Sequence, residues 1–149
     1  MKKSDPMVRQ AAQDDEFLND FTWQVFSLDK SIRFICIADD QANLLASQMK
    51  PHVKRRLTNK KVGDLLKSWT IQIVMFDKYA EITGSLVYYL IKFHNLLGAA
   101  IPLTRRKTGS RVVKGRMFLF MSFEAGTNAA NIIEDRIIPM ITEKLDYFI

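Results

Sequence analysis

The segment from Ser31 to Ala38 constrains the fold more than any other part of the chain. Its apolar residues alternate onto both sides of an extended backbone. A strand that is apolar on both sides must be covered on both sides, as in the interior of a sheet. A turn at residues 39–43 and a second apolar run at Leu44–Met49 complete a predicted hairpin. The turn has no glycine, so we expect Asn43 to take the left-handed conformation there.

The middle of the chain has the clearest helical periodicity. Apolar residues recur every three or four positions from Val62 to Phe76, which predicts one buried stripe along a helix. Thr58 or Asn59 can cap the start of this helix, and Gly84 marks its exit.

A helix is also predicted at each end of the chain. The first runs from about Met7 to Leu28 and has an acidic outer face. Trp23 and Phe26 fall away from its main apolar stripe, which indicates a second apolar contact. Residues 125–128 can cap the last helix, which Pro139 should kink or split because proline lacks a backbone N–H.

Three further strands are predicted at Ser85–Phe93, Leu97–Leu103 and Met117–Phe123, where Val, Ile, Tyr and Phe are frequent. Pro102 favours the end of a strand or an edge. The element order is therefore α-β-β-α-β-β-β-α. We predict an α+β fold, a five-stranded antiparallel sheet flanked by helices, as a single domain over residues 1–149.

Composition places the chain among ordinary globular proteins, with 149 residues, of which 48% are hydrophobic and 26% charged. Its single cysteine, Cys36, excludes an internal disulfide framework. The first residues do not resemble a secretory signal, and no apolar run reaches the length of a membrane span. We therefore expect a cytoplasmic protein without a membrane span.

Positive charge is concentrated in residues 50–116, which carry 15 Lys and Arg against 3 carboxylates. Such a region attracts anionic partners. The candidate anion-contact residues form two sets, Lys54, Arg55, Arg56, Lys60 and Lys61, and then Arg105, Arg106, Lys107, Arg111, Lys114 and Arg116. Aromatic residues are not interleaved with these cations, so any nucleic-acid contact would be directed to the phosphate backbone. Whether the two sets converge depends on the fold.

No segment predicts enzymatic chemistry. His52 and His94 are far apart in the sequence and Cys36 lies in a predicted strand, so a metal site is not indicated. Residues 109–115 have five residues between their glycines, unlike a phosphate-binding loop. We expect no catalytic residues, no metal and no cofactor.

The element order and the segment Ile32–Ser47 resemble the roadblock and longin group within the wider profilin-like architecture. Roadblock domains have in this place an apolar strand, an acidic turn and a short apolar strand that ends in small residues. Their usual turn glycine is absent, since Gln41-Ala42-Asn43 occupies the position. The resemblance implies a domain that dimerises and serves as a platform or regulator for small GTPases or larger assemblies.

A second similarity, to small archaeal proteins, rests on the Ile-Arg-Phe strand that begins at Ile32 and on a late strand that ends in Ser-Phe-Glu at Glu124. It implies no function.

We predict a non-catalytic cytoplasmic interaction module that forms a homodimer. In such a dimer the acidic first helix and the basic segments could attract each other between subunits. Two alternatives stay open: a nucleic-acid-binding protein that uses both basic sets, and a PAS- or GAF-like sensor with a small ligand enclosed by its sheet.

Overall fold

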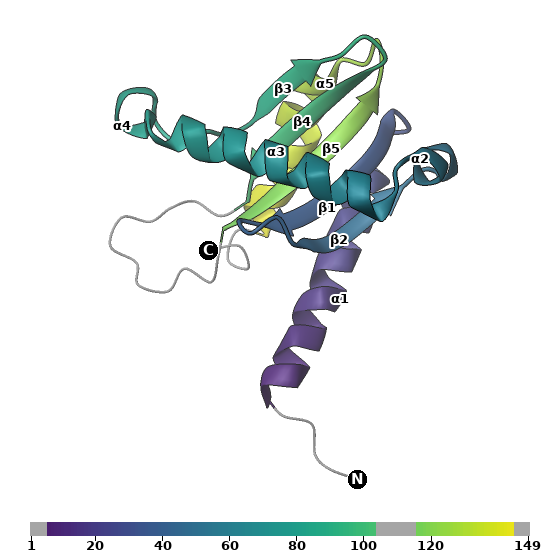
Figure 1. Ribbon diagram of the computed structural model, residues 1–149, viewed down its shortest axis with the longest axis vertical. Coiled ribbons are helices and arrows are strands. Elements are labelled where there is room, and N and C mark those ends of the chain that lie inside the picture. The colour runs from purple at the N-terminus through teal and green to yellow at the C-terminus, as the bar shows by residue number, and fades with distance from the viewer. Residues whose placement is uncertain (1–5, 104–115, 145–149) are drawn as a thin grey trace.

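The computed structural model describes residues 6–103 and 116–144, with side chains from Asp15 onward. One antiparallel sheet of five strands, in the order β2-β1-β5-β4-β3, carries helices on both faces (Figure 1). The strands are β1 (Ile32–Asp39), β2 (Leu44–Met49), β3 (Tyr89–Lys92), β4 (Leu96–Pro102) and β5 (Met117–Glu124). The helices are α1 (Pro6–Phe26), α2 (Pro51–Arg56), α3 (Asn59–Asp77), α4 (Ala80–Thr83), α5 (Ala129–Ile132) and α6 (Ile138–Glu143), with a π-helical segment η1 (Ile133–Ile137) before α6.

The sheet is buried on both faces, as the sequence of β1 predicted. On one face, α1, α5, η1 and α6 pack against Ile35 of β1 and Phe123 of β5. On the other face, α2 and α3 pack against Cys36 of β1 and Phe120 of β5. The sheet therefore separates two apolar layers, which we call the α1 layer and the α3 layer.

A β-bulge at Arg33 decides which layer the start of β1 joins. The pairing changes from Ile32 opposite Phe123 to Phe34 opposite Ser122, so Arg33 has no residue directly opposite in β5. Side chains alternate along a strand, and Ile32 would otherwise point to the same face as Phe34. The extra residue instead lets Ile32 join the α1 layer.

Small residues of β4 make room for α3 on the sheet. A Cβ atom built on Gly98 would lie 3.7 Å from Cζ2 of Trp69, so the indole ring lies directly over this glycine. The ring centroid of Trp69 is also 5.0 Å from that of Phe120 on β5. Trp69 is thus the residue that fixes the middle of α3 against two strands.

Most predicted elements are confirmed, and β2 has the predicted bounds. The expected split near Pro139 is also confirmed, since η1 gives way to α6 at Ile138. Pro102 is the last residue of β4, one of the two positions expected for it.

Three predicted boundaries are wrong. The basic segment after β2, expected as a connection, contains α2, which begins at Pro51 because proline is favoured in a first helical turn. The middle helix ends at Asp77, and the separate short helix α4 precedes Gly84, whose φ is 79°. The strand expected at Ser85–Phe93 is limited to β3.

Asp39 organises the turn between β1 and β2. Its carboxylate accepts hydrogen bonds from the backbone N–H groups of Gln41 and Asn43, each at 2.9 Å, and from the side chain of Asn43 at 3.0 Å. These bonds hold Asn43, and Ala42 takes the left-handed conformation with φ 62°. The prediction that Asn43 would adopt the left-handed conformation was wrong. The backbone N–H and the side-chain amide of Asn43 instead donate hydrogen bonds to Asp39.

Replacement of the indole ring should loosen the attachment of α3. We expect Trp69→Ala to lower the free energy of unfolding by about 3–5 kcal/mol, because it leaves a cavity over Gly98. Urea unfolding measures this loss. Lys67→Ala, at an exposed position of the same helix, is the control and should change stability by less than about 0.5 kcal/mol. A loss below about 1 kcal/mol for Trp69→Ala would contradict this role.

The two adjacent aspartates of the turn provide a matched pair. We expect Asp39→Ala to cost about 1–2 kcal/mol of unfolding free energy because three donors lose their acceptor. Asp40→Ala should cost almost nothing, since no hydrogen bond of the described residues involves its side chain. Equal effects of the two substitutions in thermal or urea unfolding would refute the role given to Asp39.

Candidate functional site

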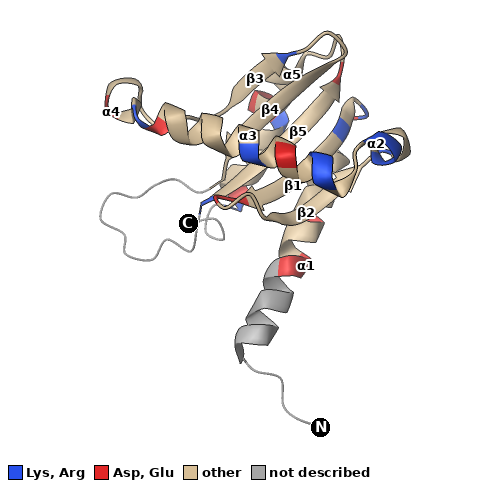
Figure 2. Cartoon of the chain, viewed as in Figure 1, with Lys and Arg blue, Asp and Glu red and all other residues tan. Residues whose placement is uncertain are grey.

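The first predicted set of cations lies on α2 and the first turn of α3, and all of its members are exposed (Figure 2). We call this set the basic surface; it consists of Lys54, Arg55, Arg56, Lys60 and Lys61. Buried Val53 and half-buried Leu57 hold the segment against the α3 layer. Within the described part of the chain, no member of the basic surface forms a salt bridge, so its charge is available to a partner.

The position of Lys60 and Lys61 is unfavourable for the helix that carries them. The first turn of α3 contains no acidic residue, although the amino end of a helix favours negative charge. Thr58, one of the two predicted caps, caps this end, with its hydroxyl oxygen accepting a hydrogen bond from the N–H of Lys61 at 3.3 Å. Helix stability therefore does not account for these two cations, which points to a role outside the chain.

Arg116 is the one member of the second predicted set that the structure describes. Its guanidinium forms a salt bridge with Asp77 at the end of α3 and lies 5.1 Å from the ring centre of Phe118. Arg116 thus joins β5 to α3 and already has an anionic partner. The other members, Arg105, Arg106, Lys107, Arg111 and Lys114, lie outside the described residues.

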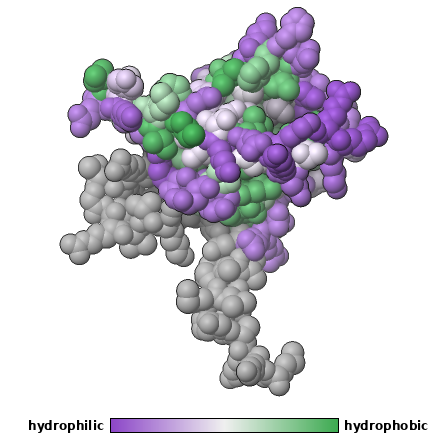
Figure 3. All heavy atoms as spheres, viewed as in Figure 1, coloured by the Kyte–Doolittle hydropathy of each residue, from purple (hydrophilic) through white to green (hydrophobic). Residues whose placement is uncertain are grey.

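A second exposed surface, which the sequence did not predict, is apolar. It covers the second half of α3, α4 and the β3 edge of the sheet, and Figure 3 shows hydrophobic side chains gathered over α3 and α4. We call it the apolar surface; its members are Ile71, Val74, Met75, Phe76, Tyr79, Ile82, Val87, Leu90 and Phe93. Ile82 of α4 is the most exposed of them, at 86%.

The outward face of α3 changes character along its length. Lys60, Asp64 and Lys67 are exposed in the first half, and Ile71 and Met75 follow at helical spacing in the second half. This change from charged to apolar residues is visible in the sequence and could have predicted the apolar surface. The apolar surface was not predicted because the helical pattern assigned Phe76, which is exposed, to the buried stripe.

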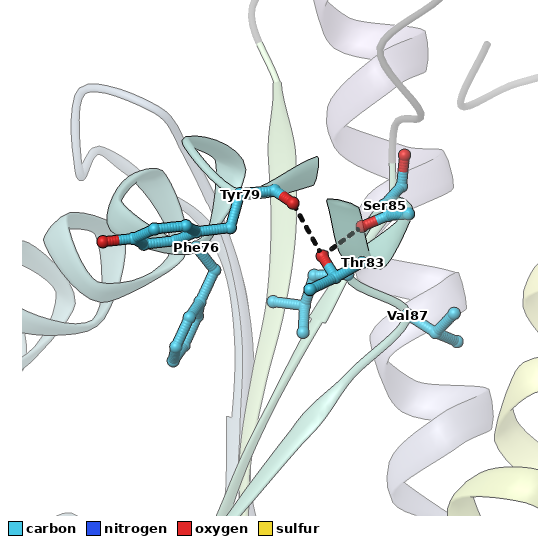
Figure 4. Close-up of a pocket in the computed structure, with 7 residues that line it drawn as sticks. Phe76, Tyr79, Thr83, Ser85 and Val87 are labelled. Atoms are coloured by element: carbon cyan, nitrogen blue, oxygen red, sulfur yellow. Dashed lines mark hydrogen bonds between the residues drawn. The ribbon is translucent and has the colours of Figure 1, made fainter. Parts of the chain in front are cut away.

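A shallow pocket of about 380 Å³ lies within the apolar surface, between α4 and the segment that leads into β3 (Figure 4). Its lining consists of Phe76, Tyr79, Thr83, Gly84, Ser85, Leu86 and Val87. The Thr83 hydroxyl is 3.1 Å from the carbonyl oxygen of Tyr79 and 2.9 Å from that of Gly84, so it is engaged by the local backbone. The pocket lies beside the sheet, unlike the enclosed cofactor site expected of a PAS- or GAF-like sensor.

Two side chains that could be reactive, Cys36 and Tyr89, are buried and half-buried. Burial raises the pKa of the Cys36 thiol well above its usual range, so the thiolate is suppressed. Burial also raises the pKa of Tyr89 to about 12, and its ring packs edge-on against Phe76. Among the side chains that the structure describes, no group of three or more His, Cys, Asp or Glu could hold a metal ion.

No helix in residues 6–103 and 116–144 combines the length and the apolar character needed to cross a bilayer. No protein-family model and no curated protein matches the sequence.

Solved structures match the fold. MglB of Myxococcus xanthus has a TM-score of 0.63 with 14% identity, over 89% of this chain and 94% of that chain. The gliding protein MglB of Thermus thermophilus has a TM-score of 0.65 with 9% identity, over 89% and 88%. A Roadblock/LC7 domain of Streptomyces avermitilis has a TM-score of 0.62 with 7% identity, over 87% and 96%. The predicted roadblock-like fold is therefore confirmed.

Proposed function

We propose that this roadblock-like domain is a non-catalytic interaction module that acts as a homodimer and binds a second protein, a small GTPase or a larger assembly. The apolar surface carries the proposal, because large exposed side chains cluster there on three neighbouring elements. Contiguous apolar patches of this kind mark protein–protein interfaces. The fold supports the class of partner through its resemblance to roadblock domains.

The open edge of the sheet favours a second copy as one occupant of the apolar surface. β3 is the last strand on its side of the sheet, so its outward N–H and C=O groups have no strand partner among the residues that the structure describes. It also carries Leu90 of the apolar surface. A two-fold contact brings the same patch of both copies together, so it would cover the apolar surface and this edge at once. One MglB structure of the same fold is described as having a tetrameric arrangement.

The opposite edge is less suited to strand pairing. β2 has a register irregularity at its pairing with Ile37 and Ala38 of β1, and Lys50 follows its last residue. Bulges and lysine residues protect strand edges from association. We therefore propose the β3 edge, rather than the β2 edge, as the dimer contact.

A charge placed in the centre of the apolar surface should separate the copies. We expect Met75→Glu to weaken dimerisation at least about 100-fold, because burial of an unpaired carboxylate costs about 3 kcal/mol or more. Light scattering at micromolar concentration should show a dimer for the wild type and a monomer for this variant. Lys67→Glu, on the outward face of the same helix but outside the apolar surface, should remain dimeric. A strictly monomeric wild type would end the dimer proposal.

Nucleic acid is the second candidate partner, favoured by the basic surface, whose members are exposed and form no salt bridge with other described residues. If its five cations contact phosphates, log K should fall with log salt at a slope of about −4.5, and affinity should fall about 500-fold from 50 to 200 mM salt. Fluorescence anisotropy with DNA and RNA oligonucleotides measures this slope. The variant Arg55→Glu/Arg56→Glu should reduce both affinity and slope, and Met75→Glu should change neither. An absence of binding at about 50 mM salt would exclude this candidate.

A further inference from the structure

Trp23 is an exposed aromatic residue that belongs to neither surface described so far. It is 57% exposed on α1, whereas Trp69, the other tryptophan of the chain, is 7% exposed. Its ring lies 6.1 Å from that of half-buried Phe26, which helps to hold it in place. Tryptophan is among the residues that contribute most at protein interfaces, so an ordered and exposed indole marks a contact site.

Two carboxylates lie on the same side of α1 as this indole. Asp20 and Glu16 precede Trp23 by three and seven residues, so they lie on the same side of α1, and both are exposed. Neither forms a salt bridge within the described part of the chain. We call these three residues the α1 surface. An indole face beside carboxylates suits a partner rich in arginine, since a guanidinium can stack on the ring while neighbouring cations pair with the acids.

The basic surface of the same chain has this chemistry. Arg55 and Arg56 lie at its centre, and no carboxylate occurs between Lys50 and Lys61. The two surfaces of one copy do not meet, because α1 packs in the α1 layer and α2 in the α3 layer, with the sheet between them (Figures 1 and 2). Each copy therefore presents an anionic aromatic surface and a cationic surface, both without a salt bridge among the described residues, on opposite sides of the sheet.

We propose that the α1 surface of one copy docks on the basic surface of a second copy. A guanidinium of Arg55 or Arg56 stacks on Trp23, and the remaining cations pair with Glu16 and Asp20. A polyanion such as nucleic acid would bind the basic surface and be repelled by the α1 surface. A contact between two copies instead pairs one surface of each kind.

The two patches are different and lie on opposite sides of the sheet, so this contact is head-to-tail and links copies into a ring or an open chain. It would link dimers into larger assemblies. The inference rests on the proposed function in one respect, because it takes the homodimer as the unit that is linked. The apolar surface takes no part in the new contact.

A charge exchange between the two surfaces tests the contact. The first variant is Glu16→Lys/Asp20→Lys and the second is Arg55→Glu/Arg56→Glu, all at exposed positions. At about 50 mM salt the wild type should grow beyond a dimer as its concentration rises, and each variant alone should stay dimeric. The first variant places like charges on the facing surfaces, and the second removes both guanidinium groups and leaves the basic surface with three lysines and two glutamates. An equimolar mixture of the two variants should associate again, since the unaltered basic surface of the first variant meets the unaltered α1 surface of the second. Analytical ultracentrifugation measures all four samples.

Two further measurements show whether the indole and the charges both take part in this contact. Assembly should shift tryptophan emission to the blue, since Trp69 is already buried and Trp23 loses water, and Trp23→Ala should weaken association about tenfold. Assembly should also be lost at about 500 mM salt, where exposed charges are screened.

Met75→Glu should break the dimer but leave the head-to-tail contact between monomers, so the two proposals can fail separately. Wild-type dimers that do not associate further at about 100 μM protein and about 50 mM salt would overturn the inference. So would single variants that assemble like the wild type, or a mixture that stays dimeric. If the basic surface binds oligonucleotides while the charge exchange has no effect on assembly, the occupant is nucleic acid and the inference is wrong.

Discussion

Burial of both faces of β1 and β5 is the constraint on which the rest of the molecule depends. Ile35 and Phe123 need cover on one side, and Cys36 and Phe120 need it on the other. A sheet can satisfy both demands only with helices in two separate layers. This requirement places α1 and α3 on opposite sides of the sheet. The acidic and basic elements of the chain are thereby kept apart, and each is left facing outward.

α3 combines two tasks along one helix. Its inward stripe, anchored by Trp69 over Gly98, closes the α3 layer. Its outward side is charged near the amino end and apolar near the carboxyl end, where Met75 is exposed. One helix therefore contributes to the basic surface and to the apolar surface without a change in its buried contacts. The same division explains why charge reversal on α2 and an acidic substitution at Met75 are expected to act independently.

The sequence predicted what local chemistry decides. Period and composition were sufficient for the bounds of β2, and they limited the cap of α3 to Thr58 or Asn59, because both features depend on neighbouring residues. The basic surface was also predicted as a set, although its helical form was missed since six residues show no periodicity. The left-handed residue at Ala42 depends on which donor Asp39 binds, and a sequence does not show this.

Contacts between distant residues were beyond such reasoning. The sequence predicted Arg116 as a cation available to an anionic partner. In the structure it pairs with Asp77, which lies 39 residues away in the sequence. The apolar surface was missed for a related reason. Ile71 and Met75 are apolar residues in a helix whose inner stripe is already complete, and only the packed structure shows that nothing in the described part of the chain covers them.

The bulge at Arg33 makes the start of β1 sensitive to length in a way that its side chain does not suggest. Among the described residues its guanidinium has a long salt bridge, 3.8 Å, with Glu124, so the position does not depend on a close ion pair. Deletion of Arg33 should have a larger effect than its substitution. A single-codon deletion would turn Ile32 out of the α1 layer or pull the connection from α1 out of register. Natural variation at this point should therefore change the identity of the residue far more readily than the number of residues.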